Sequence, residues 1–162
     1  MVVTRSEKLS ARIHDLKTYD EKQHYETRFN YKMTNIQAAI GLVQLNRLDS
    51  FIRQRREAAQ RYLKALSFPG LRLPPNDPAH TYFRFVIGLE VDSQPIIRNL
   101  IKKGVGCNRP IHTPLHHCLN ISGCPNTDTA WETSLSIPIY PSLSNEDVER
   151  VIEIVTDTLA RE

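Results

Sequence analysis

Apolar side chains recur at helical spacing through the first half of the chain. Between residues 35 and 66 they stand three or four positions apart, and no proline interrupts them. This spacing predicts a single long helix over residues 36–66, which exceeds the usual length of roughly 8–20 residues. Thr34 and Gln37 have the spacing of a capping box at its start. The run Phe68-Pro69-Gly70 is expected to end it.

The segment before this helix has a different pattern. Apolar positions between residues 9 and 16 predict a short helix, and Thr4 and Glu7 have the spacing of a capping box at its start. Residues 1–4 resemble the end of a β-strand, from which we expect the chain to be part of a larger protein. Residues 18–33 fit no period but carry four aromatic side chains, so we expect an irregular, ordered segment there.

Strand and helix signals alternate after residue 66. The expected order is strand, helix, strand, short helix, strand and helix, over residues 82–89, 93–104, 105–111, 127–133, 135–140 and from residue 144 onward. Ser93 is the expected N-cap of the first of these helices, and Gly104 is its expected C′ residue. This order describes a small α+β domain over residues 67–162, with a short sheet covered by helices on one face.

Composition narrows the class of protein. The formal charge is +3, from 21 basic and 18 acidic residues, which is too small an excess to indicate a nucleic-acid partner. No apolar run approaches the ~20 residues of a membrane-spanning helix. The first residues carry no secretory signal pattern, so we expect a cytoplasmic protein with three free cysteines.

Candidate metal and thiol chemistry is confined to one part of the chain. His112 and His116 have the four-residue spacing of a helical metal site and stand near Cys118, but Pro114 lies between them and disfavours a helix. Zinc sites show tighter paired spacings, so we expect no metal ligands here. Cys107 as a thiol nucleophile lacks a glycine-rich elbow and an orienting acid. These residues by themselves indicate only a soluble α+β domain.

A longer stretch gives a more specific signal. Residues 29–48 read FNYKMTNIQAAIGLVQLNRL, which resembles, without a gap, the signature YNYRMT..QAAIG..QL..L of the DegT/StrS-type sugar aminotransferases. Residues 110–116, PIHTPLH, resemble the RP…PLH loop on the substrate side of one subgroup. Residues 136–143, SIPIYPSL, resemble the family's SLPIYPSL. The resemblance covers nearly the whole chain.

The resemblance implies a pyridoxal-phosphate enzyme of fold type I, with a large cofactor-binding domain and a small carboxy-terminal α+β domain. Residues 1–35 are then a remnant of the large-domain edge with the cofactor-contacting loop, residues 36–66 the connecting helix and residues 67–162 the small domain. Members resemble one another in forming homodimers and mostly move an amino group from glutamate to a nucleotide-linked keto-sugar. Their Schiff-base lysine lies just before the position where this chain begins. We therefore expect the isolated chain to bind no cofactor and to be inactive.

Four site residues follow from the resemblance. Asn30 matches the asparagine that reaches across the dimer to the cofactor phosphate, and its amide is a suitable neutral donor. Lys32 stands where many members have arginine, and it keeps the charge without the bidentate fork. His112 and His116 belong to the substrate-side loop. The residues themselves leave open a turn-forming Asn30 and a solvated histidine loop.

Three functions remain open at this point. The first is the carboxy-terminal part of a pyridoxal-phosphate-dependent sugar aminotransferase. The second is a noncatalytic interaction or regulatory module that completes a partner subunit. The third is an unrelated metal or thiol enzyme built on His112, His116 and Cys118.

Overall fold

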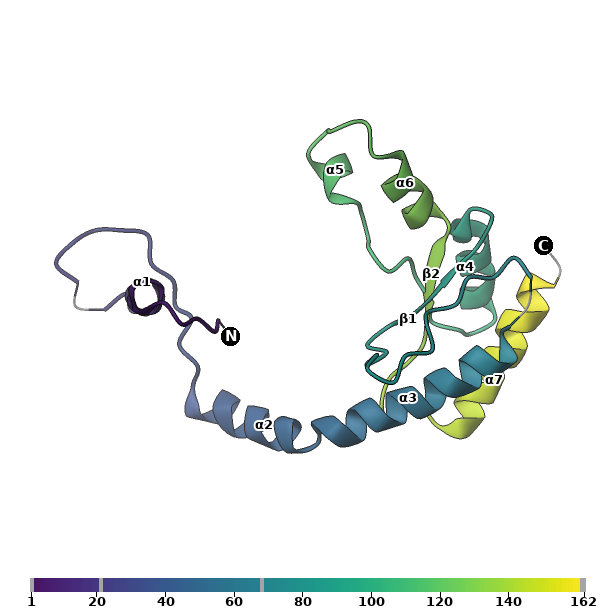
Figure 1. The fold of residues 1–162 in the computed structure, drawn as a ribbon, viewed down its shortest axis with the longest axis horizontal. Coiled ribbons are helices and arrows are strands. Elements are labelled where there is room, and N and C mark those ends of the chain that lie inside the picture. The colour runs from purple at the N-terminus through teal and green to yellow at the C-terminus, as the bar shows by residue number, and fades with distance from the viewer. Residues whose placement is uncertain (1, 21, 68, 161–162) are drawn as a thin grey trace. The chain divides into compact units, whose positions relative to one another are not determined.

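The computed structural model describes residues 2–20, 22–67 and 69–160 of the chain, which divides into two compact units, Met1–Arg47 and Leu48–Glu162 (Figure 1). The strand end expected at Met1 and the helix end expected at Phe68 lie outside the described residues. None of the helices in the described ranges combines the length and the apolar character that crossing a membrane requires. The unit boundary falls inside the segment expected to form one long helix.

The amino-terminal unit begins with helix α1, Glu7–Lys17, whose start differs from the prediction. Ser6 is the N-cap, and its side-chain oxygen accepts from the Leu9 N–H at 3.3 Å. Thr4 lies outside the helix and accepts from the Ser6 N–H at 3.1 Å, so the capping box expected at Thr4 and Glu7 is wrong. Residues 2–4 form no strand, and the described residues from 18 to 34 form neither helix nor strand, as expected.

Helix α2, Asn35–Asn46, starts as the sequence predicts. Thr34 accepts from the Gln37 N–H at 3.2 Å, and the Gln37 side chain accepts from the Thr34 N–H at 2.9 Å, which completes the capping box. The expectation of one helix over 36–66 is wrong, because α2 ends at Asn46 and a separate helix α3, Leu48–Ala65, follows. The Arg47 N–H donates to Gln44 O at 3.1 Å, a contact that tightens the last turn of α2.

The carboxy-terminal unit combines helices with a two-stranded sheet, as expected for an α+β domain. Strands β1, Phe85–Gly88, and β2, Ser134–Ile137, pair antiparallel, with Phe85 opposite Ile137 and Gly88 opposite Ser134. The strand expected over 105–111 is wrong. Only Asn108 forms a bridge to Ser136, because the next amide, that of Arg109, donates instead to the Asn108 side chain at 2.9 Å.

Three longer helices pack around this sheet. Helix α7, Asn145–Leu159, contacts both α3 and α4, Ser93–Lys102, and α4 also contacts β2. The Tyr62 ring meets Phe85 edge-on at 5.1 Å, and its hydroxyl donates to Pro138 O at 2.9 Å. The fully buried apolar side chains, which form one core, include Ala59, Tyr62, Leu66, Phe85, Ile87, Leu100, Leu135 and Val155.

The ends of these helices set the local chain directions. Asp92, not Ser93, is the N-cap of α4, since its carboxylate accepts from the Gln94 N–H at 3.0 Å. Gly104 is the C′ residue as predicted, with φ +87°, and the amides of Gly104 and Val105 bond back into the last turn as a Schellman motif. Ser144 caps α7 with a capping box.

Two short helices, α5 and α6, form an arm that leads into β2 (Figure 1). Helix α5, Leu115–Cys118, lies in a segment that was expected to be irregular. Pro114 stands at its N-cap position, where a proline removes no helical hydrogen bond. Helix α6, Pro125–Glu132, carries Trp131, as the sequence predicts for a short helix in this region.

Candidate functional site

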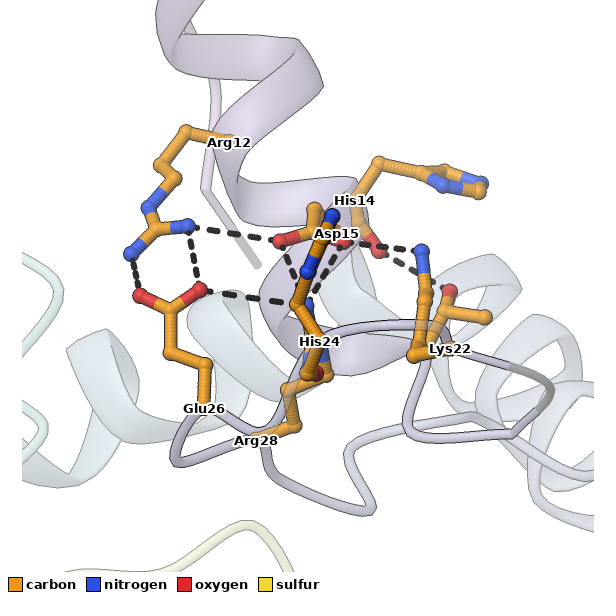
Figure 2. A network of polar contacts seen from close by, with 8 residues as sticks. Arg12, His14, Asp15, Lys22, His24, Glu26 and Arg28 are labelled. Atoms are coloured by element: carbon orange, nitrogen blue, oxygen red, sulfur yellow. Dashed lines mark hydrogen bonds and ion pairs between the residues drawn. The ribbon is translucent and has the colours of Figure 1, made fainter.

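A polar cluster in the amino-terminal unit connects α1 to the segment after it (Figure 2). Arg12 donates through both terminal nitrogens to the Glu26 carboxylate, one of them at 2.9 Å. Asp15, one turn along α1, accepts from Lys22 Nζ at 2.8 Å and lies 3.4 Å from Arg28 Nη2. The hydrogen bond from Lys22 lowers the pKa of Asp15, and the hydrogen bond from Arg12 lowers that of Glu26.

Arg28 fixes the segment that carries the predicted cofactor residues. Its side chain is only 10% exposed, and Nη1 donates to His24 O at 2.8 Å. Its Nε is buried without a partner among the described residues. The next amide, that of Phe29, donates to Leu16 O in α1 at 2.8 Å. These contacts place the stretch from Phe29 onward against the end of α1.

Asn30 and Lys32 occupy alternate positions of this stretch. The rings of Phe29 and Tyr31 stack on each other at 5.2 Å and 4°, so they share one side of the backbone. Asn30 is exposed. Lys32 Nζ lies 2.6 Å from Asp20 Oδ2, and this hydrogen bond raises the pKa of Lys32. The stretch therefore presents a carboxamide and an ammonium group to solvent.

A second polar cluster lies in the carboxy-terminal unit, between α5 and α6. Asp128 Oδ1 accepts from His116 Nε2 at 2.8 Å and from His117 Nε2 at 2.7 Å. The two imidazole rings are 4.4 Å apart. The hydrogen bond from His116 is the largest of the effects that lower the pKa of Asp128. Burial opposes this shift in part, and the hydrogen bond from His117 adds to it. A single carboxylate oxygen thus joins two neighbouring histidines to the next helix.

Trp131 extends this cluster toward α4. The His117 ring meets the indole edge-on at 5.5 Å and 87°. Arg109 covers the same indole, with Cζ 4.0 Å from the ring centre, and its Nη2 lies 2.6 Å from Asp92 Oδ1. The indole N–H donates to Ile111 O at 2.9 Å. Each contact holds the next, so the rings of the second cluster have little freedom to turn.

The histidines and cysteines of the sequence hypotheses are distributed differently from the expectation. His112 is exposed and lies outside the group formed by His116, and Cys118 is exposed as well. Cys107 is buried, and burial raises the pKa of its thiol to about 11, which removes support for a thiolate nucleophile there. Sequence reasoning assigned no role to Asp128, because this residue follows the histidines across a loop and no periodic signal connects them.

Comparison with known proteins decides the family. A model of the DegT/DnrJ/EryC1/StrS aminotransferase family matches residues 1–156. The chain belongs to this family. The resemblance carried by residues 29–48 is thereby confirmed, and members of the family use pyridoxal phosphate.

Individual relatives of the DegT/DnrJ/EryC1/StrS family are longer than this chain. The GDP-perosamine synthase of Escherichia coli O157:H7 is 30% identical over an alignment of 168 positions, which covers 97% of this chain and 46% of that protein. The aminotransferase TlmJ from Streptoalloteichus hindustanus has a TM-score of 0.85 and 31% identity over 97% of this chain and 46% of its own. DesV from S. venezuelae, solved with a ketimine intermediate, has a TM-score of 0.80 and 25% identity over 96% and 45%. The chain spans about half the length of these relatives.

Proposed function

We propose that the chain forms the carboxy-terminal part of a pyridoxal-phosphate-dependent aminotransferase that transfers an amino group from glutamate to a nucleotide-linked keto-sugar. Family membership over residues 1–156 is the observation that carries this proposal. The similarity of the chain to a protein named GDP-perosamine synthase supports a nucleotide-linked sugar as the substrate. Residues 67–162 are then the small domain of the enzyme, and the lysine that holds the cofactor lies in a part of the protein outside this chain.

The amino-terminal unit fits a role in holding the cofactor phosphate. When bound, pyridoxal phosphate withdraws electrons from the carbon that carries the amino group. Asn30 is exposed and offers a neutral N–H donor, and Lys32 two residues later adds a positive charge. The partner of Lys32, Asp20, is itself half exposed, and such solvent-exposed pairs are weak. A phosphate dianion can therefore replace the Asp20 carboxylate at little cost.

The substrate-side role of the histidine loop stays a prediction. His112 is the exposed member of the pair, whereas the His116 side chain is only 11% exposed and is held by Asp128. We propose that His112 faces the nucleotide-linked sugar and that His116 shapes the loop that presents it. Arg109, fixed between Asp92 and the Trp131 ring, supplies a permanent positive charge close to the same loop.

A homodimer is the assembly that we propose. None of the residues of α2 is buried within the chain. Its apolar side chains that are more than half exposed are Ile36, Ile40, Leu42, Val43 and Leu45. A contiguous apolar surface of this kind normally marks an interface. The same observation favours the second candidate function, a noncatalytic module that completes the site of a partner subunit.

One experiment separates the two candidate functions. The 162-residue chain, mixed with pyridoxal phosphate and then reduced with borohydride, is expected to give no stoichiometric adduct on a single lysine. The same chain, extended by the protein sequence encoded directly upstream, is expected to transfer the amino group of glutamate to a nucleotide-linked keto-sugar. An upstream frame without a lysine followed by Gly-Gly, or an extended protein that binds no pyridoxal phosphate, contradicts the aminotransferase and leaves the noncatalytic module.

The role of Asn30 has its own test in the extended protein. Asn30→Ala removes one hydrogen bond to a charged phosphate, for which the usual contribution is about 1.5–3 kcal/mol. The dissociation constant of pyridoxal phosphate is therefore expected to rise about 10- to 100-fold. Thr27→Ala, in the same exposed segment, serves as the matched control and is expected to leave it unchanged. Equal effects of the two substitutions contradict a specific phosphate contact.

A further inference from the structure

We propose that His116, His117 and Asp128 bind one divalent transition-metal cation of the zinc class. Each side chain offers one ligand atom, and the three atoms lie within 4.8 Å of one another. They form the one such group among residues 2–20, 22–67 and 69–160. The proposal concerns the carboxy-terminal unit alone and does not depend on the aminotransferase function.

The distances between the ligand atoms suit a small cation. Tetrahedral zinc sites have metal–nitrogen and metal–oxygen distances of about 2.0–2.2 Å, which separates neighbouring ligand atoms by roughly 3.4 Å. Here the Asp128 oxygen lies 2.8 Å and 2.7 Å from the two imidazole nitrogens. Insertion of a cation therefore requires the carboxylate oxygen to move away from each of the two nitrogens by roughly 0.6–0.7 Å. The Asp128 side chain is 35% exposed, and rotation of its carboxylate provides such a movement.

Neighbouring positions on a helix normally point to different sides. His116 and His117 are consecutive in α5, yet both ring nitrogens converge on one carboxylate oxygen. Convergence of this kind is what a shared central ion requires.

The surroundings of the group hold it in place. The His117 ring packs edge-on against Trp131, and Trp131 is fixed by Arg109 and by its bond to Ile111 O. Metal-binding histidines depend on such surrounding contacts for their orientation. A bound cation then ties α5 to α6 and closes the loop between them. Helix α6 also contacts the segment that contains His112, because the Trp131 indole N–H donates to Ile111 O.

The donor set indicates which cations are selected. Two imidazole nitrogens and one carboxylate suit zinc, cobalt or nickel, whereas magnesium and calcium prefer sites made of oxygen alone. Three protein ligands leave one tetrahedral position for water. Both histidines must offer an unprotonated Nε2, so binding moves the remaining ring proton to Nδ1. Affinity is expected to fall as the pH is lowered, because protons compete with the cation for the ligand atoms.

The test is calorimetric titration of the chelator-treated 162-residue chain with Zn²⁺ at neutral pH. We expect one ion per chain with a dissociation constant below about 10 μM. Asp128→Asn, which preserves shape, and His116→Ala are each expected to weaken binding about 100-fold or more, since even surrounding residues typically contribute 10- to 100-fold. His112→Ala and Cys118→Ser are the matched controls from the same segment and should change the constant less than about threefold.

A second measurement keeps the result independent of folding defects. Co²⁺ in a tetrahedral site gives absorption bands in visible light. We expect these bands for the parent chain and not for Asp128→Asn. The far-ultraviolet circular dichroism of the two proteins should be the same, which shows that both are folded. Three results overturn the proposal. They are a parent without Zn²⁺ binding, unchanged binding in Asp128→Asn, and a loss in His112→Ala equal to that in His116→Ala, which indicates adventitious binding to surface histidines.

Discussion

In the amino-terminal unit none of the described residues from 2 to 47 is buried, whereas the carboxy-terminal unit encloses a continuous apolar core. The first unit is connected by ion pairs that are open to solvent on at least one side, centred on Asp15 and Glu26. The second is held by side chains such as Tyr62 and Phe85 that exclude water completely. Solvent-exposed ion pairs contribute little to stability, and burial of apolar surface contributes most of it.

This difference indicates which unit depends on contact with another protein surface. Ordering a residue costs about 1–2 kcal/mol of backbone entropy, which a unit without a core cannot recover from within. The carboxy-terminal unit has the core of an independent domain. The amino-terminal unit instead presents apolar surface on α2 and the aromatic stack of Phe29 and Tyr31. Surface of this kind becomes stabilising when another protein surface covers it.

The largest effect is expected from a substitution in the core. Phe85→Ala should lower the free energy of unfolding of the carboxy-terminal unit by about 3–5 kcal/mol, because it leaves a cavity beside Tyr62. Tyr31→Ala removes an aromatic ring from the other unit, where it is 76% exposed, and should cost less than about 1 kcal/mol. Urea unfolding monitored by circular dichroism measures both. Equal losses would mean that the first unit also has a cooperative core.

The next effect concerns the exposed face of α2. We expect the chain to self-associate through this helix, because each covered apolar side chain contributes about 1.5–3 kcal/mol. Ile40→Glu should weaken association at least tenfold in light scattering across a concentration series. Gln44→Glu adds the same charge at a polar, exposed position of the same helix and should have little effect. A parent chain that stays monomeric at high concentration contradicts the proposed interface.

A matched pair of helix caps gives a smaller difference. Thr34 and Ser144 each complete a capping box, one in each unit. Ser144→Ala should lower the free energy of unfolding of the carboxy-terminal unit by about 1 kcal/mol. Thr34→Ala should instead reduce the helix content of α2 without shifting that transition. Thr4→Ala serves as control, since Thr4 caps no helix, and a shift of the main transition by Thr34→Ala would show that the units unfold together.

The smallest effect is expected from acid. Hydrogen bonds from Lys22 and Arg12 lower the pKa values of Asp15 and Glu26 in the folded chain. The contribution of these two carboxylates to stability is therefore complete above the pKa values of the unfolded chain, near 4. It is lost as the pH falls through the lower folded values. Amide resonances of residues 22–28 should therefore shift between about pH 5 and pH 2 while those of β1 and β2 stay constant. Asp15→Asn should reduce the shift, and no shift in the parent would mean that these pairs do not persist in solution.

Local chemistry was the part of the fold that the sequence predicted best. The capping box at Thr34, the start of the last helix at Ser144 and the C′ position of Gly104 depend on residues within four positions of one another. Where two capping residues compete, the prediction chose the wrong one, and Asp92 caps α4 in place of Ser93. The break at Arg47 leaves no signal, because its backbone stays in the helical region and the apolar spacing continues across it.

The site was harder to predict than the fold. Pro114 does exclude a helix that would join His112 and His116, but it also begins a new one that places His116 beside His117. The contact of these rings with Asp128 crosses a loop, and no periodic pattern records such a pair. Asn30 and Lys32 were found through the family signature only, and their roles stay predictions.

The unequal burial of the cysteines gives this protein a natural reporter. With a pKa of about 11, the Cys107 thiol is ionised in about one molecule in ten thousand at pH 7, and its side chain is closed off by the core. Cys118 is exposed at the end of α5, immediately after His117. A thiol-directed fluorophore or spin label therefore reaches Cys118 in preference to Cys107, and Cys124→Ser removes the third, partly exposed thiol. The label then stands one residue from His117, where it can follow movement of α5 in real time.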